Sequence, residues 1–131
     1  QEVKDEARQY EADPQVRGQQ RRRRQELLAK GMMGRVPKAD VVVVNPTHYA
    51  VALQYDAAQM NAPQVTAKGK DGVAARIRDK ARENRVPVVH NPPLTRRLFA
   101  EAELGGEVPG NLFGAVAEVL AYVYRLRGRT A

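Results

Sequence analysis

The chain has 131 residues, of which 43% are hydrophobic, so it can form one globular domain with an appendage. It has no cysteine, which excludes a disulfide framework, a thiol nucleophile and thiolate metal sites. Its two histidines, His48 and His90, are too few for a persuasive zinc site, so we expect neither a metal nor a cofactor. The chain begins with Gln1 and lacks an apolar run of ~20 residues, which suggests a piece of a longer protein whose membrane spans, if any, lie elsewhere.

The net charge of +7 is concentrated toward the N-terminus, around Arg21, Arg22, Arg23 and Arg24. Three interpretations are open for this run: a solvated helix face, a patch that contacts anionic lipid, or an arm that binds nucleic acid. Nucleic acid is the weaker partner, because no aromatic residue separates the arginines and no groove-reading motif is present.

Residues 1–35 are polar and rich in Gln, Glu and Arg, which predicts a helical or flexible linker. We expect Gly31 and Gly34 to interrupt it with a short link. A globular domain is expected over residues 36–131, beginning near Val36 and Pro37.

The domain opens with strand patterns. Val41 to Val44 is an unbroken β-branched run, typical of a strand buried on both faces. Tyr49 to Tyr55 alternates large and small residues, which predicts a strand with its larger side chains on one face. Gln64 to Lys68 predicts a short third strand.

Helical periods come next along the chain. A helix is expected from Asp71, ended by Pro87, which also opens a strand over 86–90. Asn91, with two prolines after it, predicts the cap of another helix, and the last helix is expected over about 112–127. The inward residues expected of these helices are Val73, Ile77, Ala81, Leu94, Leu98, Phe99, Leu112, Val116, Val119, Leu120, Val123 and Leu126. The order β-β-β-α-β-α-α predicts an α/β (α+β) fold, a small mixed four-stranded sheet surrounded by helices.

The sequence between the first two strands, Asn45-Pro46-Thr47-His48, has the composition of a reactive turn. Pro46 has no N–H, so the backbone attack that deamidates Asn45 is blocked. The reverse attack remains, in which the Asn45 side-chain nitrogen closes a succinimide on its own carbonyl and expels Pro46. Any Asn-Pro is more often an ordinary turn, and Asn91-Pro92 provides a control expected to be inert.

Three features favour reaction at Asn45. It lies between two apolar strands, so its carbonyl can be held rigidly. A two-residue connection with a type I turn would fit the strand twist poorly and store strain. Thr47 and His48 add a hydroxyl and an imidazole that can orient the amide, stabilise the oxyanion or move a proton. The alternative for His48 is an exposed residue with no chemical role.

This motif and its surroundings resemble the cytoplasmic domain of the FlhB/YscU family of membrane-anchored proteins in flagellar and type III export. The resemblance covers about residues 25–128 and is carried by five segments. They are residues 37–53, residues 65–69, the helix from Asp71, residues 86–94 and residues 117–124. The residues after the motif, Tyr49-Ala50-Val51-Ala52-Leu53, are most like the flagellar branch.

The resemblance implies a single self-cleavage between Asn45 and Pro46, after which the two pieces stay associated. It also implies that the cut lets the export apparatus change the class of substrate that it exports. It implies a place on the cytoplasmic side of the bacterial inner membrane, with residues 1–35 joining a transmembrane part. The implied partners are other export-gate components, a hook-length ruler protein and export substrates. Two other functions stay open: a non-cleaving binding module of the export gate, and a basic nucleic-acid-binding domain.

Overall fold

The computed structural model describes residues 13–46 and 48–130. The chain divides into two compact units, one ending at Gly31 and one beginning at Met32. The second unit therefore begins four residues before the predicted start of the domain at Val36.

Helix α2 (Pro14–Arg35) begins after Asp13, whose carboxylate accepts a hydrogen bond from the Gln15 N–H at 2.9 Å. The predicted link at Gly31 and Gly34 is wrong, because the helix continues through both glycines. A glycine costs a helix only about 1 kcal/mol relative to alanine. Burial of Met32 in the core of the second unit offsets that cost.

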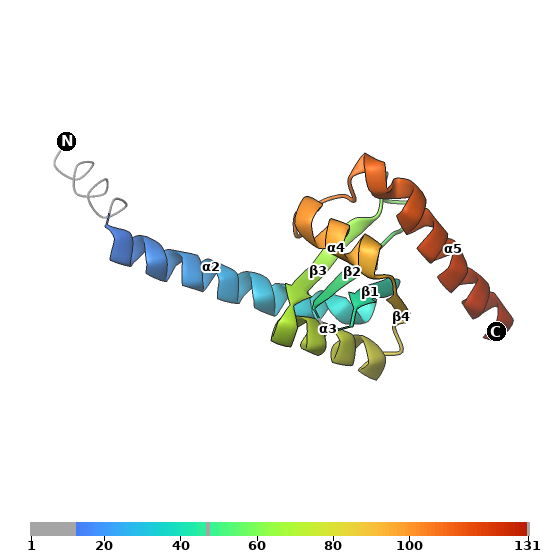
Figure 1. The fold of residues 1–131 in the computed structure, drawn as a ribbon, viewed down its shortest axis with the longest axis horizontal. Helices are drawn as coiled ribbons and strands as arrows, with labels where there is room; N and C mark the ends of the chain where they lie inside the picture. The colour runs from blue at the N-terminus through green and yellow to red at the C-terminus, as the bar shows by residue number, and fades with distance from the viewer. Residues whose placement is uncertain (1–12, 47, 131) are drawn as a thin grey trace. The chain divides into compact units, whose positions relative to one another are not determined.

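Four strands form one mixed sheet, as the sequence predicts (Figure 1). They are β1 (Val41–Asn45), β2 (Tyr49–Gln54), β3 (Gln64–Lys70) and β4 (Val88–His90). The order across the sheet is β3-β2-β1-β4, with β4 parallel to β1 and the other neighbours antiparallel. The valine run is thus a central strand, and all five residues of β1 are buried.

Helices cover both faces of this sheet (Figure 1). Val41 and Val43 face one core, which α4 (Pro92–Glu101) and α5 (Phe113–Thr130) close. Val42 and Val44 face the other core, which α3 (Asp71–Glu83) closes together with Met32 and the 3-10 helix η1 (Val36–Lys38). A strand between two apolar layers needs no polar face, which explains its unbroken run of valines.

The end of α3 differs from the prediction. The helix stops at Glu83 rather than at Pro87, and β4 begins at Val88 rather than at Val86. Arg85 adopts a left-handed conformation (φ 59°). The next N–H, of Val86, donates to the carbonyl of Ala81 at 2.8 Å, and this closes the helix as a Schellman motif.

The last two helices begin close to where the sequence places them. Asn91 caps α4, because its side-chain oxygen accepts a hydrogen bond from the Leu94 N–H at 3.3 Å. A 3-10 helix, η2 (Gly110–Leu112), precedes α5. The prediction that Leu126 faces inward is wrong, because this residue is 38% exposed.

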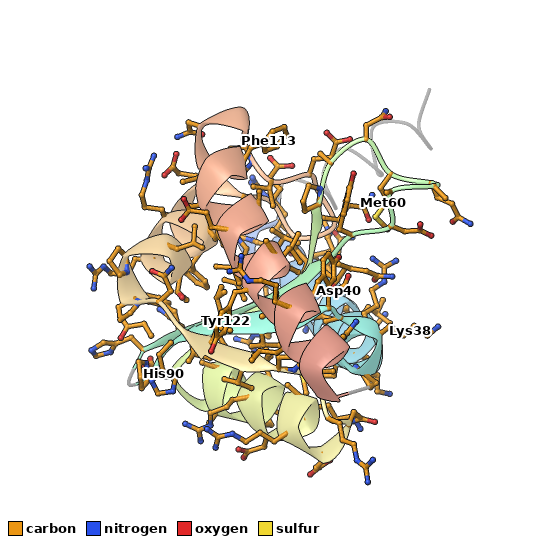
Figure 2. The ribbon with its side chains drawn as sticks, turned by 90° about the vertical axis from the view of Figure 1, so that its right-hand side faces the viewer. Lys38, Asp40, Met60, His90, Phe113 and Tyr122 are labelled. Carbon is orange, nitrogen blue, oxygen red and sulfur yellow. The ribbon has the colours of Figure 1, made fainter. Side chains whose placement is uncertain are left out.

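Asp40 fixes the open end of the β1–β2 hairpin; Figure 2 labels it. Its N–H donates to the Leu53 carbonyl at 2.9 Å, and its carboxylate accepts from the Tyr55 N–H at 2.7 Å. These two bonds hold the register of the strands, and the register decides the geometry of the loop at the other end.

Candidate self-cleavage site

The four-residue motif lies where β1 turns into β2. The strands pair Val44 with Ala50 and Asn45 with Tyr49, so three residues form the loop. The predicted two-residue connection is therefore wrong. Loops of three residues built on a type I turn are common in hairpins, so this loop gives no reason to expect strain at the Asn45–Pro46 bond.

Asn45 is the last residue of β1 and is 9% exposed. Its backbone carbonyl accepts a hydrogen bond from the His48 N–H at 2.9 Å. That bond polarises the carbonyl that a cyclising side chain would attack. Pro46 and His48 are exposed, whereas Thr47 lies outside the described residues.

Two backbone donors from outside the hairpin hold the two ends of the loop. The Asn91 N–H donates to the carbonyl of Val44 at 3.1 Å, just before Asn45. The Asp71 N–H donates to the carbonyl of His48 at 2.9 Å. Asp71 is one residue beyond the end of β3 and itself has a left-handed backbone (φ 52°). The segment that contains the motif is therefore fixed at one end by the residue after β4 and at the other by the first residue of α3.

The second Asn-Pro pair has a different environment. The side chain of Asn91 is occupied as the cap of α4, and its carbonyl accepts from the N–H and the hydroxyl of Thr95 at 2.9 and 2.7 Å. Within the part of the chain that the structure describes, no hydrogen bond occupies the side-chain amide of Asn45. The two asparagines thus share a dipeptide but differ in the freedom of the attacking group.

A small hollow of about 30 Å³ adjoins the Asn45–Pro46 bond. Asn45 lines it from the end of β1, Pro46 and His48 line it from the loop, and Asp71 and Arg78 line it from α3. Its size suits about one or two water molecules. A larger open groove of about 430 Å³, between β4 and α5, includes His90 and Tyr122 (both labelled in Figure 2) and contains none of the motif.

Asp71 is the residue of this site that the sequence does not predict. The sequence pattern at this position indicates only the start of a helix. The contact with His48 joins residues 23 positions apart, and no local pattern signals it. Among the predicted site residues, the structure places Asn45, Pro46 and His48 together, with the His48 ring 6.2 Å from the ring of Tyr49.

Comparisons with known proteins agree with this fold. The model of the FlhB HrpN YscU SpaS family matches residues 1–123. The chain belongs to this family. It is 52% identical to the flagellar biosynthetic protein FlhB of Escherichia coli K12 and 45% identical to that of Bacillus subtilis 168, each over 127 residues and 97% of the chain. The chain spans about a third of the length of these relatives, 33% and 35%.

Solved structures of family members share the fold. The cytoplasmic domain of FlhB from Shewanella putrefaciens is 49% identical, with a TM-score of 0.74 over 78% of each chain. The C-terminal domain of EscU with an Asn-to-Ala substitution is 29% identical, with a TM-score of 0.68 over 70% of this chain and 92% of that one. The resemblance to the family and the predicted α+β fold are therefore confirmed. No helix in the described residues is long and apolar enough to cross a membrane.

Proposed function

We propose that this chain cleaves itself once, between Asn45 and Pro46, as part of a flagellar export protein. The observation that carries the proposal is the state of the Asn45 carbonyl. The carbonyl lies at the end of a buried strand and accepts a hydrogen bond from the His48 N–H, and among the described residues no hydrogen bond occupies the side chain of Asn45. The reaction needs no external substrate, metal or cofactor.

The chemistry is an intramolecular acyl transfer. The Asn45 Nδ2 atom forms a bond to the Asn45 backbone carbon, and the bond from that carbon to the Pro46 nitrogen breaks. Nδ2 loses a proton, and the Pro46 nitrogen gains one and becomes a new secondary amine. The products are a C-terminal succinimide, which water later opens, and a chain that begins at Pro46.

The environment supports each stage of this transfer. The His48 N–H is placed to stabilise the negative charge that develops on the carbonyl oxygen, as an oxyanion donor does. Fixing both ends of the loop limits the conformations that a free peptide would sample. Pro46 and His48 are both exposed, and the leaving nitrogen is proposed to take its proton from solvent or from the imidazole of His48. The Thr47 hydroxyl is proposed as a second polar group, on the sequence alone.

Cleavage would leave the domain folded. β1 is central, pairs with β2 and β4, and has four valines that are at most 2% exposed. Each fully buried valine contributes roughly 1.5–3 kcal/mol. The cut would therefore change the surface at the loop, not the core.

The biological role of the cut is proposed from the family. The longer protein would be anchored in the bacterial inner membrane, with residues 1–35 as linker and residues 36–131 as the cytoplasmic domain. Freed at the loop, the domain would change the class of exported substrate through contacts with other export-gate components, the hook-length ruler protein and the substrates. Arg21, Arg22, Arg23 and Arg24 are exposed and suited to anionic lipid.

Intact-mass spectrometry of purified protein tests the cleavage. We expect two fragments, one ending at Asn45 and one beginning at Pro46. Asn45→Ala should abolish them because it removes the attacking nitrogen. Asn91→Ala, the matched control, should leave them unchanged.

A chain that stays whole after prolonged incubation at neutral pH would contradict the proposal. The loop would then serve as a docking surface of an export-gate binding module. Binding to nucleic acid at low salt, lost steeply as salt rises, would favour the third function.

A further inference from the structure

Asp71 is bonded to the loop that carries the scissile peptide. Its N–H donates to the His48 carbonyl at 2.9 Å, and the His48 N–H donates to the Asn45 carbonyl at 2.9 Å. His48 therefore links the backbone of Asp71 to the oxygen that would carry the developing charge. Asp71 also lines the hollow beside the Asn45–Pro46 bond.

The backbone of Asp71 is unusual for its place in the chain. Its φ of 52° lies in the left-handed region, which disfavours residues with a Cβ atom. β3 ends at Lys70, which pairs with Tyr49 and has an extended backbone, so the Asp71 N–H continues the β2–β3 ladder toward His48. The left-handed φ of Asp71 then turns the chain directly from this bond into α3. Strained residues of this kind cluster at functional sites.

We propose that Asp71 is a positioning residue for self-cleavage, acting through its left-handed backbone and its hydrogen bond to His48. This inference rests on the proposed function. Asp71 takes no part in the bond changes at Asn45. It fixes the His48 peptide, and with it the oxyanion donor, in the geometry that cyclisation needs.

The chain offers a matched control for backbone strain. Among the described residues, Arg85 is the other non-glycine residue with a positive φ, 59°. Its conformation is explained by the Schellman motif at the end of α3, and it does not line the hollow beside the motif loop. Equivalent substitutions at Asp71 and Arg85 strain the backbone similarly, but only those at Asp71 would disturb the loop.

The experiment measures the cut over time in this chain made by cell-free synthesis with a pulse of labelled amino acid. Asp71→Val, which disfavours a positive φ, should slow cleavage by about tenfold or more. Two variants should cleave at a rate within about twofold of that of the unsubstituted chain. Asp71→Gly keeps the positive φ and the N–H, and Asp71→Asn tolerates this φ without the charge. Arg85→Val should lower the melting temperature and leave the cleavage rate unchanged.

Folding is checked separately by circular dichroism and melting of each variant combined with Asn45→Ala. If Asp71→Val does not fold there, the milder Asp71→Ala takes its place in the comparison. Equal slowing by the valine substitutions at Asp71 and Arg85, or no slowing at Asp71, would overturn the inference. Slowing by Asp71→Asn equal to that of Asp71→Val would assign the effect to the carboxylate and also overturn it. An unsubstituted chain that never cuts overturns the proposed function first, and the inference with it.

Discussion

The two Asn-Pro dipeptides of this chain lie in different environments, so the dipeptide alone does not decide whether its asparagine can cyclise. β1 and β4 are parallel, with Val44 opposite His90, so Asn45 and Asn91 lie at the same edge of the sheet. Asn91 continues into a helix that occupies its side chain and its carbonyl. Asn45 continues into a loop in which the described residues occupy its carbonyl but not its side chain. The proposed reactivity of Asn45 and the expected inertness of Asn91 therefore depend on the segment that each residue leads into.

Pro46→Ala should change the chemistry as well as the rate. Without the fixed φ of proline the loop is less organised, and we expect cleavage to slow by about tenfold. The new backbone N–H can attack the Asn45 side chain, so deamidation should compete with cleavage. Intact-mass spectrometry with peptide mapping over several days measures both products.

One result with Pro46→Ala would contradict this prediction. Cleavage at the rate of the unsubstituted chain, with no deamidated peptide containing position 45, would show that proline is not what directs the reaction. Pro92→Ala is the matched control and should produce neither a cut nor rapid deamidation, since the side chain of Asn91 caps α4.

At the scale of elements, the junction of β3 and α3 matters because it presents Asp71 to the loop. Gly69 is buried in β3 and pairs with Ala50. A Cβ atom at this glycine would lie 2.9 Å from the Cβ of Val73 in α3 and 3.3 Å from the nitrogen of Ala74. The close approach of the strand to its own helix thus requires glycine.

Gly69→Ala should destabilise the domain by roughly 1–3 kcal/mol, the usual cost of overpacking. Urea unfolding of the uncut Asn45→Ala background measures the free energy. Adding Val73→Ala should recover part of the loss, because it removes the γ-methyl group of Val73 that the new Cβ would also meet, although the contact with the Cβ of residue 73 remains. Gly72→Ala, where nothing lies within 4 Å of the new methyl, should be neutral or slightly stabilising. A Gly69→Ala domain as stable as the background would show that α3 moves freely away from the sheet.

At the scale of the whole molecule, the position of β1 decides what a cut can do. The strand has neighbours on both sides and helices over both faces, so a break at its end leaves its contacts intact. The piece ending at Asn45 also carries Met32 and Val36 into the core. Cutting would therefore make a two-chain complex with the fold of one domain.

This arrangement predicts a concentration-dependent stability. Unfolding of the cut protein separates two chains, so its urea midpoint should rise with protein concentration, by the equivalent of about 1.4 kcal/mol for each tenfold increase. The uncut Asn45→Ala chain should show no such dependence. The cut pieces should elute together from a native sizing column and separate on a denaturing gel. Separate elution under native conditions would contradict a retained β1.

Much of the fold could be predicted from local patterns. The valine run at 41–44 predicts a strand buried on both faces, because only apolar side chains suit two cores. Asn91 followed by two prolines predicts the start of α4, because cap and first turn are set by adjacent residues. The helix through Gly31 and Gly34 could not be predicted, since burial of Met32 against a distant part of the chain outweighs the weak propensity of glycine.

The sequence by itself determined the proposed reacting pair, because the missing N–H of Pro46 and the side-chain amide of Asn45 belong to the covalent structure of the two residues. Only the tertiary structure decided the geometry around them. The loop has three residues because Asp40 and the strand pairing set the register from the far end of the hairpin. Asp71 meets His48 because β3 lies beside β2 and ends opposite the loop. Register and contact depend on residues distant in sequence, and no local spacing encodes them.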